Sequence, residues 1–206
     1  MEPILTQLKA HLKGAILTDI AERRRVSHDA SIYELVPDVV IHPQDSRDVQ
    51  SLVKTVSHYK STYPQLAITP RSAGTDMSGA AIGHSIVLDM TTHFDTIESF
   101  HENTLKLQPG VFMRDIDPLL AKEGMQLGSV PASRAYCTIG GIVGNNSGGE
   151  QSLRYGNADR WVRELKVVLG DGNEYVIKPL TKKQLDKKIA EETYEAHLYK
   201  NLFELI

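Results

Sequence analysis

Apolar residues in the first half of the chain recur at two spacings, one typical of helices and one typical of strands. Helical spacing over residues 3–12 predicts a short helix, and a β-branched run between two prolines at 37–43 predicts a strand. Ser46 is a typical N-cap for a helix predicted over 47–63, and residues 66–69 predict the next strand. This strand–helix–strand unit predicts two parallel strands that pair through a right-handed crossover.

The second half of the chain has short apolar runs at closer spacing. Pro109 and Gly110 interrupt these runs, and residues 113–123 have the apolar spacing of an amphipathic helix. The pattern predicts a second lobe with a mixed sheet and few helices. The predicted strands are 86–88, 95–100, 105–107, 162–169 and 174–177, with a turn at 170–172, and a charged helix is predicted from Thr181 to Ile206.

Composition excludes several classes of protein. The 206 residues carry a net charge of −3, which gives no general attraction to nucleic acid or anionic membrane. A single cysteine, Cys137, excludes an internal disulfide and a cysteine-built metal site. The start of the chain lacks the apolar run of a secretory signal, and no run approaches the ~18 residues of a bilayer span. These features predict a cytoplasmic protein.

The histidines show no pattern typical of a metal site. They stand without the paired spacing that metal ligands on one helix require, so we expect structural or surface roles and no bound metal. The histidines considered are His42, His58, His84, His93 and His101.

The most informative stretch is the glycine-rich connection over residues 69–83, which lies between two predicted strands. It contains three glycines, several small residues and one proline. Glycine permits positive φ and a close approach of the backbone, and consecutive N–H groups in such a turn can form an anion site. The pattern therefore predicts a loop that wraps a phosphate or diphosphate, with an ordinary wide turn as the alternative. The sequence has neither the P-loop pattern nor the G-x-G-x-x-G fingerprint.

A second long stretch, residues 128–149, is nearly uncharged. It contains six glycines, two asparagines and three serines beside a few aliphatic residues. Connecting loops usually carry charge, whereas small side chains, amides and hydroxyls suit the wall of a site for a flat ligand with polar edges. The alternative is tight packing of a glycine-rich segment against a sheet.

Six motifs occur in an order that resembles one family. They are P-R-S-A-G-T-D-M-S-G, V-L-D-M, Q-P-G-V, P-A-S followed by T-I-G-G and N-N-S-G-G, R-Y-G-N followed by D-R-W-V, and V-V-L-G-D-G. Together they resemble the FAD-binding domain of the vanillyl-alcohol oxidase and p-cresol methylhydroxylase (PCMH) superfamily, in its D-lactate dehydrogenase and glycolate oxidase FAD-subunit branch. The resemblance extends over roughly residues 30–177.

The resemblance implies an α+β, two-lobed PCMH-type fold that holds FAD between its lobes. It implies a helical lead-in at 1–29, an FAD-binding domain at 30–178 with lobes near 30–83 and 84–178, and a helix at 179–206 that leads to a missing continuation.

The resemblance also implies the residues of the cofactor site. The first loop would wrap the diphosphate with its backbone amides, and the second would line the adenosine, ribityl and flavin portions, with Val162 near the adenine. The first-loop residues are Pro70, Arg71, Ser72, Ala73, Gly74, Thr75, Asp76, Met77 and Ser78. The second-loop residues are Pro131, Ala132, Ser133, Thr138, Gly140, Gly141, Asn145, Ser147 and Gly148.

Three departures from the family pattern qualify this prediction. Thr75 stands where covalent members have a histidine, which predicts non-covalent FAD. Asp76 stands where the branch usually has glycine, and an acid beside a diphosphate costs Coulomb energy unless it turns away or meets a cation. Cys137 is one position out of register with the cysteine that binds flavin in some relatives, so we expect a small buried thiol.

The activity implied by the resemblance is oxidation of a 2-hydroxy acid of the D-lactate or glycolate type, by hydride transfer to flavin N5. The substrate would bind through a domain that this chain lacks, and the catalytic residues stay unassigned. Two alternatives remain: a non-catalytic FAD-binding subunit that needs a partner chain or oligomer, and another enzyme of the superfamily, similar to alkylglycerone-phosphate synthase or UDP-N-acetylenolpyruvoylglucosamine reductase. A peripheral position at the inner face of the membrane is an alternative to a purely cytoplasmic one.

Overall fold

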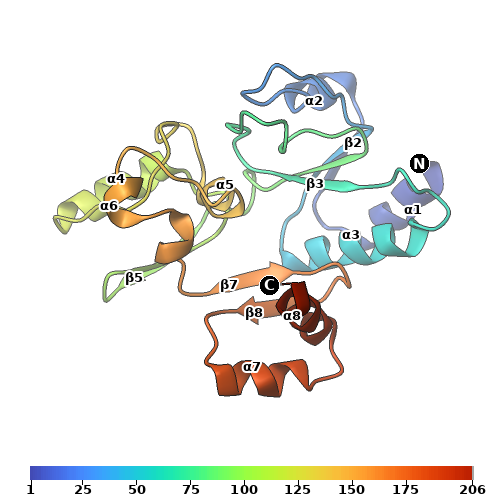
Figure 1. The fold of residues 1–206 in the computed structure, drawn as a ribbon. Coiled ribbons are helices and arrows are strands. Elements are labelled where there is room, and N and C mark those ends of the chain that lie inside the picture. The colour runs from blue at the N-terminus through green and yellow to red at the C-terminus, as the bar shows by residue number, and fades with distance from the viewer. Residues whose placement is uncertain (206) are drawn as a thin grey trace.

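The computed structural model describes residues 1–205, and its first part is a four-stranded mixed sheet (Figure 1). The strand order is β1-β2-β4-β3, in which β1 is antiparallel to β2 and the other three strands are parallel. The strands are β1 (Ala15–Leu17), β2 (Val39–His42), β3 (Ile68–Arg71) and β4 (Ile86–Asp89).

The predicted direct pairing of the first two parallel strands is wrong, because β4 lies between β2 and β3. All four residues of β4 are buried, which is the pattern of a central strand covered on both faces.

Helices cover both faces of this sheet. The helices are α1 (Glu2–His11), α2 (Ile20–Arg25) and α3 (Ser46–Tyr59). Leu8 of α1 and Leu52 of α3 pack with Val39 and Ile41 on one face, whereas Val40 packs on the other face beside the end of α2. The predicted N-cap of α3 is corrected by one residue. Asp45 makes the cap by accepting hydrogen bonds from two N–H groups of the first turn, and the helix ends at Tyr59.

A second group of elements follows β4 and surrounds a separate core. The elements are β5 (Ile97–His101), β6 (Thr104–Leu107), α4 (Met113–Lys122), α5 (Ile139–Gly144), α6 (Ser152–Tyr155) and a 3-10 turn, η1 (Ala158–Trp161). Met113 and Ile116 of α4 pack against Ile142 of α5 and the hairpin β5–β6. The sequence predicted no helix at 139–144, because three of these six residues are glycines.

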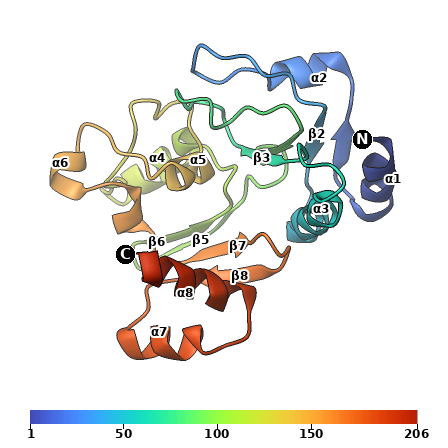
Figure 2. The same cartoon turned by 45° about the vertical axis from the view of Figure 1, so that its right-hand side comes forward.

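The last elements are a hairpin and two helices, which Figures 1 and 2 show below the other two groups. They are β7 (Leu165–Val168), β8 (Glu174–Ile177), α7 (Lys182–Ile189) and α8 (Tyr194–Leu205). The hairpin turn at Gly172 packs against Lys54 of α3. The single C-terminal helix that the sequence predicted is two helices with a break near 190–193, and Ile206 lies outside the described residues.

The sheet extends beyond the predicted limits of the first lobe. It takes β1 from the predicted lead-in and β4 from residues after the predicted boundary at 83. We therefore propose lobes divided after β4, near residue 90. None of the helices within residues 1–205 combines the length and apolar character needed to cross a membrane.

Asp48 joins α1, β1 and α3 through one buried carboxylate. Its side chain is 1% exposed. It accepts hydrogen bonds from the backbone N–H groups of Lys13 (2.9 Å), Gly14 (2.8 Å) and Gln44 (2.8 Å). A carboxylate with three such donors fixes the path of two loops against α3.

We predict that Asp48→Asn lowers the free energy of unfolding by about 2–4 kcal/mol, because buried donors lose a charged acceptor. Urea unfolding followed by circular dichroism measures the change. Asp186→Asn on the exposed face of α7 is the matched control, with an expected change of less than about 0.5 kcal/mol. Equal effects of the two substitutions would contradict the role of Asp48.

Candidate functional site

The glycine-rich loop connects two adjacent parallel strands, β3 and β4. It begins after Arg71, at the carboxyl end of β3. Ligands of open α/β sheets bind in the crevice outside the carboxyl ends of parallel strands. The loop therefore lies where the topology favours a binding site.

The first part of this loop presents backbone donors that the protein does not use. Among the described residues, the N–H groups of Ser72, Ala73, Gly74 and Thr75 make no hydrogen bond to a protein acceptor. Gly74 has φ of +69°, a value that L side chains rarely adopt. Consecutive unpaired N–H groups around a left-handed residue can form an anion-binding concavity.

The side chain of Arg71 lies beneath this part of the loop and is buried. One guanidinium nitrogen donates to the carbonyl of Ala81 at 3.0 Å. A Cβ atom on Gly74 would collide with the guanidinium group. The resemblance implied that the backbone amides of a loop including Arg71 wrap the diphosphate, which stays a prediction; the side chain of Arg71 packs behind that loop.

Asp76 organises the second part of the loop. One carboxylate oxygen accepts hydrogen bonds from the Ser78 hydroxyl (2.6 Å), the Ser78 N–H (2.8 Å) and the Ala80 N–H (3.0 Å). These bonds, first that from Ser78, lower the pKa of the Asp76 carboxyl. The backbone carbonyl of Asp76 accepts from the N–H of Ala30 at 2.8 Å, while the Met77 side chain is exposed. The acid is therefore engaged within its own turn.

The second predicted segment meets the first at Gly141. A Cβ atom on Gly141 would lie 3.8 Å from Cβ of Ser72 and 3.8 Å from Oγ1 of Thr138. Thr138 is 1% exposed, and its hydroxyl has no partner in the described chain. A buried hydroxyl without a partner is costly unless a ligand or water completes it. The structure thus brings Ser72, Thr138 and Gly141 together.

Helix α5 uses its glycines for different purposes. Gly140 faces inward, where a Cβ atom would meet Pro109 at 2.6 Å, and its N–H donates to the Pro109 carbonyl. Gly141 is exposed, and so are Gly144 and Asn145 one turn further on. Gly144 is not among the residues predicted from the sequence, although its i+3 spacing from Gly141 places it on the same face of α5.

The remaining second-loop residues hold the segment in place. The Ser133 carbonyl accepts the N–H groups of two following residues, and the Ser147 carbonyl accepts the Ser129 hydroxyl at 3.1 Å. A Cβ atom on Gly148 would approach Asn157 to 2.7 Å. Pro131 and Ala132 lie in the same turn, ahead of α5. None of these contacts tests the predicted contact with a cofactor.

Val162 lines a cavity of about 360 Å³. Val143, at the end of α5, lines the same cavity and connects it to the second segment. The lining residues are Val143, Asn146, Asp159, Val162, Arg163, Leu165, Ile177, Lys178 and Pro179. Asp159, in η1, belongs to the D-R-W-V motif of the resemblance, whereas the sequence offered no signal for Lys178, which follows β8.

Cys137 belongs to the second segment and is buried. Its side chain is 3% exposed and packs in the core around α4, where burial raises the pKa of the thiol. The expected buried thiol is confirmed. Within residues 1–205, no group of three or more His, Cys, Asp or Glu side chains is placed to hold a metal ion.

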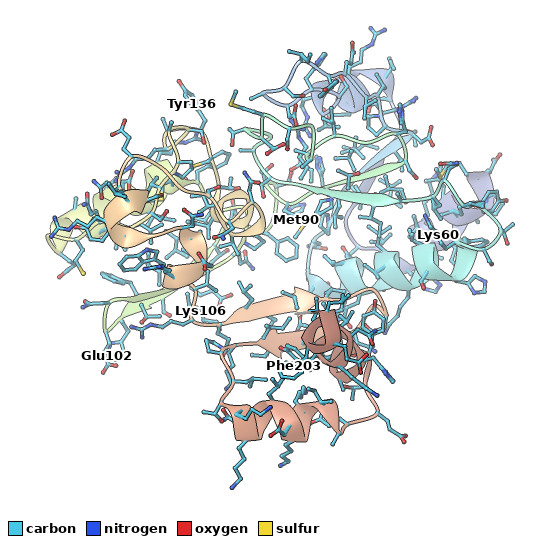
Figure 3. The ribbon with its side chains drawn as sticks, viewed as in Figure 1. Lys60, Met90, Glu102, Lys106, Tyr136 and Phe203 are labelled. Atoms are coloured by element: carbon cyan, nitrogen blue, oxygen red, sulfur yellow. The ribbon has the colours of Figure 1, made fainter. Side chains whose placement is uncertain are left out.

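Figure 3 shows how the two segments are arranged. Met90 lies where the chain leaves the sheet for the second lobe, and its N–H donates to the Arg71 carbonyl at 2.9 Å. Tyr136 lies at the outer tip of the second segment and is 69% exposed.

Comparison with known proteins identifies the class. A model of the FAD binding domain family matches residues 37–178, and the chain therefore belongs to this family. Its fold is similar to that of an alkyldihydroxyacetonephosphate synthase (TM-score 0.72, 21% identity, 87% of this chain and 36% of that one). It is also similar to a chitooligosaccharide oxidase (TM-score 0.70, 15% identity, 91% and 38%). The fold is the two-lobed α+β PCMH-type fold, as predicted.

Curated relatives include several dehydrogenases. The D-2-hydroxyglutarate dehydrogenase of Escherichia coli (strain K12) is 29% identical over 169 residues, which are 81% of this chain. The glycolate oxidase subunit GlcD of Bacillus subtilis (strain 168) is 31% identical over 157 residues, or 74% of this chain. The chain spans 16% of the length of the first relative and 32% of the second.

FAD is the cofactor of this family, and the described residues fit its chemistry. The unpaired N–H groups of Ser72–Thr75 suit a diphosphate, and the unpartnered Thr138 hydroxyl suits a polar edge of the cofactor. The open cavity beside Val162, lined by both aliphatic and charged residues, has a volume in the lower range of small-molecule sites. Which part of FAD each residue contacts stays a prediction.

We predict opposite effects of two substitutions at Asp76. Asp76→Asn keeps an oxygen acceptor and removes a negative charge near the diphosphate, so FAD should bind as tightly as to wild type or several-fold more tightly. Asp76→Ala removes the acceptor, and FAD should bind about tenfold more weakly than to the Asn variant. Quenching of flavin fluorescence gives both dissociation constants, and equal constants would contradict the role of the turn.

The pH dependence follows from the lowered pKa of Asp76. A carboxyl with a depressed pKa contributes stability above its ordinary range and loses it as the pH falls through the lowered value. The stabilisation of the wild-type loop by the Asp76 carboxylate should therefore be lost only under strongly acidic conditions.

Proposed function

We propose that this chain is the FAD-holding part of an oxidoreductase that oxidises a small 2-hydroxy acid, of the D-lactate, glycolate or D-2-hydroxyglutarate type. The observation that carries the proposal is the run of four unpaired N–H groups at the end of β3, in a chain of the FAD binding domain family. The names of the relatives support the substrate class.

In this proposal the residues of the chain bind and orient the cofactor. Ser72–Thr75 hold the diphosphate through backbone N–H groups, and the open face of α5 at Gly141 and Gly144 gives the cofactor room beside Thr138. The cavity at Val162 takes the adenine. Bound FAD supplies the acceptor for two electrons and a proton from the substrate.

We propose that FAD is held without a covalent bond. The side chain that follows Gly74 is Thr75, whose hydroxyl is not a typical nucleophile for flavin attachment. Cys137 is buried in the core around α4. The catalytic base and the substrate-binding groups would come from another segment or from a partner chain, and the complete enzyme would work in the cytoplasm.

The direct test is an absorption spectrum of the purified chain after mixing with FAD and desalting. We expect flavin bands that stay with the folded protein and leave it on acid precipitation, as non-covalent binding requires. A folded protein without flavin bands, and without measurable FAD binding at equilibrium, would contradict the proposal.

A substitution on the open face of α5 tests the location of the site. Gly141→Leu places a bulky side chain next to Ser72 and should weaken FAD binding at least about tenfold, because the leucine occupies the space of the cofactor. Ala121→Leu, also exposed on a helix of the same lobe, is the matched control and should leave the dissociation constant unchanged. Equal binding by both variants would move the site away from α5.

A further inference from the structure

The environment of Arg71 differs from that of most arginines in this chain. Only 8% of the residue is exposed, and no carboxylate of the described chain lies within ion-pair distance of it. An arginine keeps its charge in a protein, and a buried charge is costly unless it is paired or hydrogen-bonded. The partners of Arg71 are instead backbone carbonyls, those of Ala81 at 3.0 Å and Val26 at 3.5 Å.

The nearby acids are engaged elsewhere or are more distant. Asp89 stands opposite Arg71 in the register of β3 and β4. One of its oxygens accepts from Arg25 at 2.9 Å, and the other accepts from the hydroxyl and N–H of Thr91. Asp29 also lies close enough to favour the charged form of Arg71, without an ion pair. The guanidinium therefore keeps a positive charge beneath the loop without a direct ion pair to any carboxylate of the described chain.

The hydrogen bonds of the Arg71 side chain link the two ends of the loop. Arg71 is the last residue of β3, and Ala81 is ten positions further along, near the end of the loop. Val26 caps the end of α2. One side chain thus ties the start of the loop, its end and α2 together, and Gly74 lies directly on the guanidinium group. The unpaired N–H groups of Ser72–Thr75 belong to the segment that this side chain supports.

We propose that Arg71 is a positioning residue for the diphosphate, which acts from behind the loop without touching the cofactor. Its guanidinium closes the loop, holds the N–H groups of Ser72–Thr75 in one concavity, and provides a buried positive charge for which the diphosphate is the counter-charge. This inference rests on the proposed FAD site and assigns to Arg71 a role different from that of the loop backbone.

The test compares FAD, which has a diphosphate, with riboflavin, which has none, in equilibrium titrations of wild type, Arg71→Gln and Arg71→Lys. For Arg71→Gln we expect FAD to bind about tenfold or more weakly, with a change of less than about threefold for riboflavin. The dependence of FAD binding on salt should also become shallower, because a charge is lost. Arg71→Lys keeps the charge and should restore part of the FAD affinity and the salt dependence.

Arg23→Gln is the matched control, because Arg23 also donates to a backbone carbonyl, that of Pro37 at 2.6 Å, but lies outside the loop. It should leave both dissociation constants unchanged. If Arg71→Gln lowers the affinity for FAD and for riboflavin equally, or lowers neither, the inference about Arg71 is overturned, although the wild type still binds FAD. Failure of the wild type to bind FAD would instead overturn the proposed function.

A double-mutant cycle keeps the proposal testable if Arg71→Gln folds poorly. In the wild type, the new Cβ of Gly74→Ala collides with the guanidinium group, and alanine is also strained at the positive φ of this position. In an Arg71→Lys background the guanidinium is gone, so only the backbone strain remains. Gly74→Ala should therefore weaken FAD binding several-fold more in the wild type than in the Arg71→Lys background. Additive effects in the cycle would contradict contact between Arg71 and the loop.

Discussion

Four consecutive backbone N–H groups follow the end of β3 and have no acceptor in the described chain, those of Ser72–Thr75. Much of the surrounding structure holds these groups in place. Unpaired donors are costly when water is excluded, so a loop that presents them needs support from its other groups. Arg71 closes the loop from behind, and Asp76 gathers the donors of the following turn on one carboxylate oxygen. We propose that these donors form a site for an anion.

In the proposed site, the second lobe contributes helix α5. Its buried Ile142 anchors the helix in the core around α4, and Gly140 allows the backbone to approach Pro109. Because these contacts face inward, Gly141 and Gly144 are exposed, and Gly141 lies beside Ser72 of the first loop and the unpartnered hydroxyl of Thr138. Packing of the second core thereby fixes the position of the groups that we propose to face the cofactor.

The sequence predicted the elements that depend on local pattern, and it missed features that depend on tertiary contacts. Apolar runs and glycines located β3, β4 and the loop, because burial and positive φ leave signals in neighbouring residues. The insertion of β4 between β2 and β3 leaves no such signal. Helix α5 was not predicted, because tertiary packing overrides the weak helix propensity of I-G-G-I-V-G. The burial of Arg71 was not predicted either, because arginine is usually exposed.

The central claim is that the unpaired amides of the first loop hold the diphosphate of FAD. The most direct measurement is an amide NMR titration of the labelled chain with FAD. We predict that the amide protons of Ser72–Thr75 show the largest downfield shifts, because they gain charged acceptors, and that Gly141 shifts with them. Binding of FAD that leaves the amides of Ser72–Thr75 unshifted would contradict this account of the site.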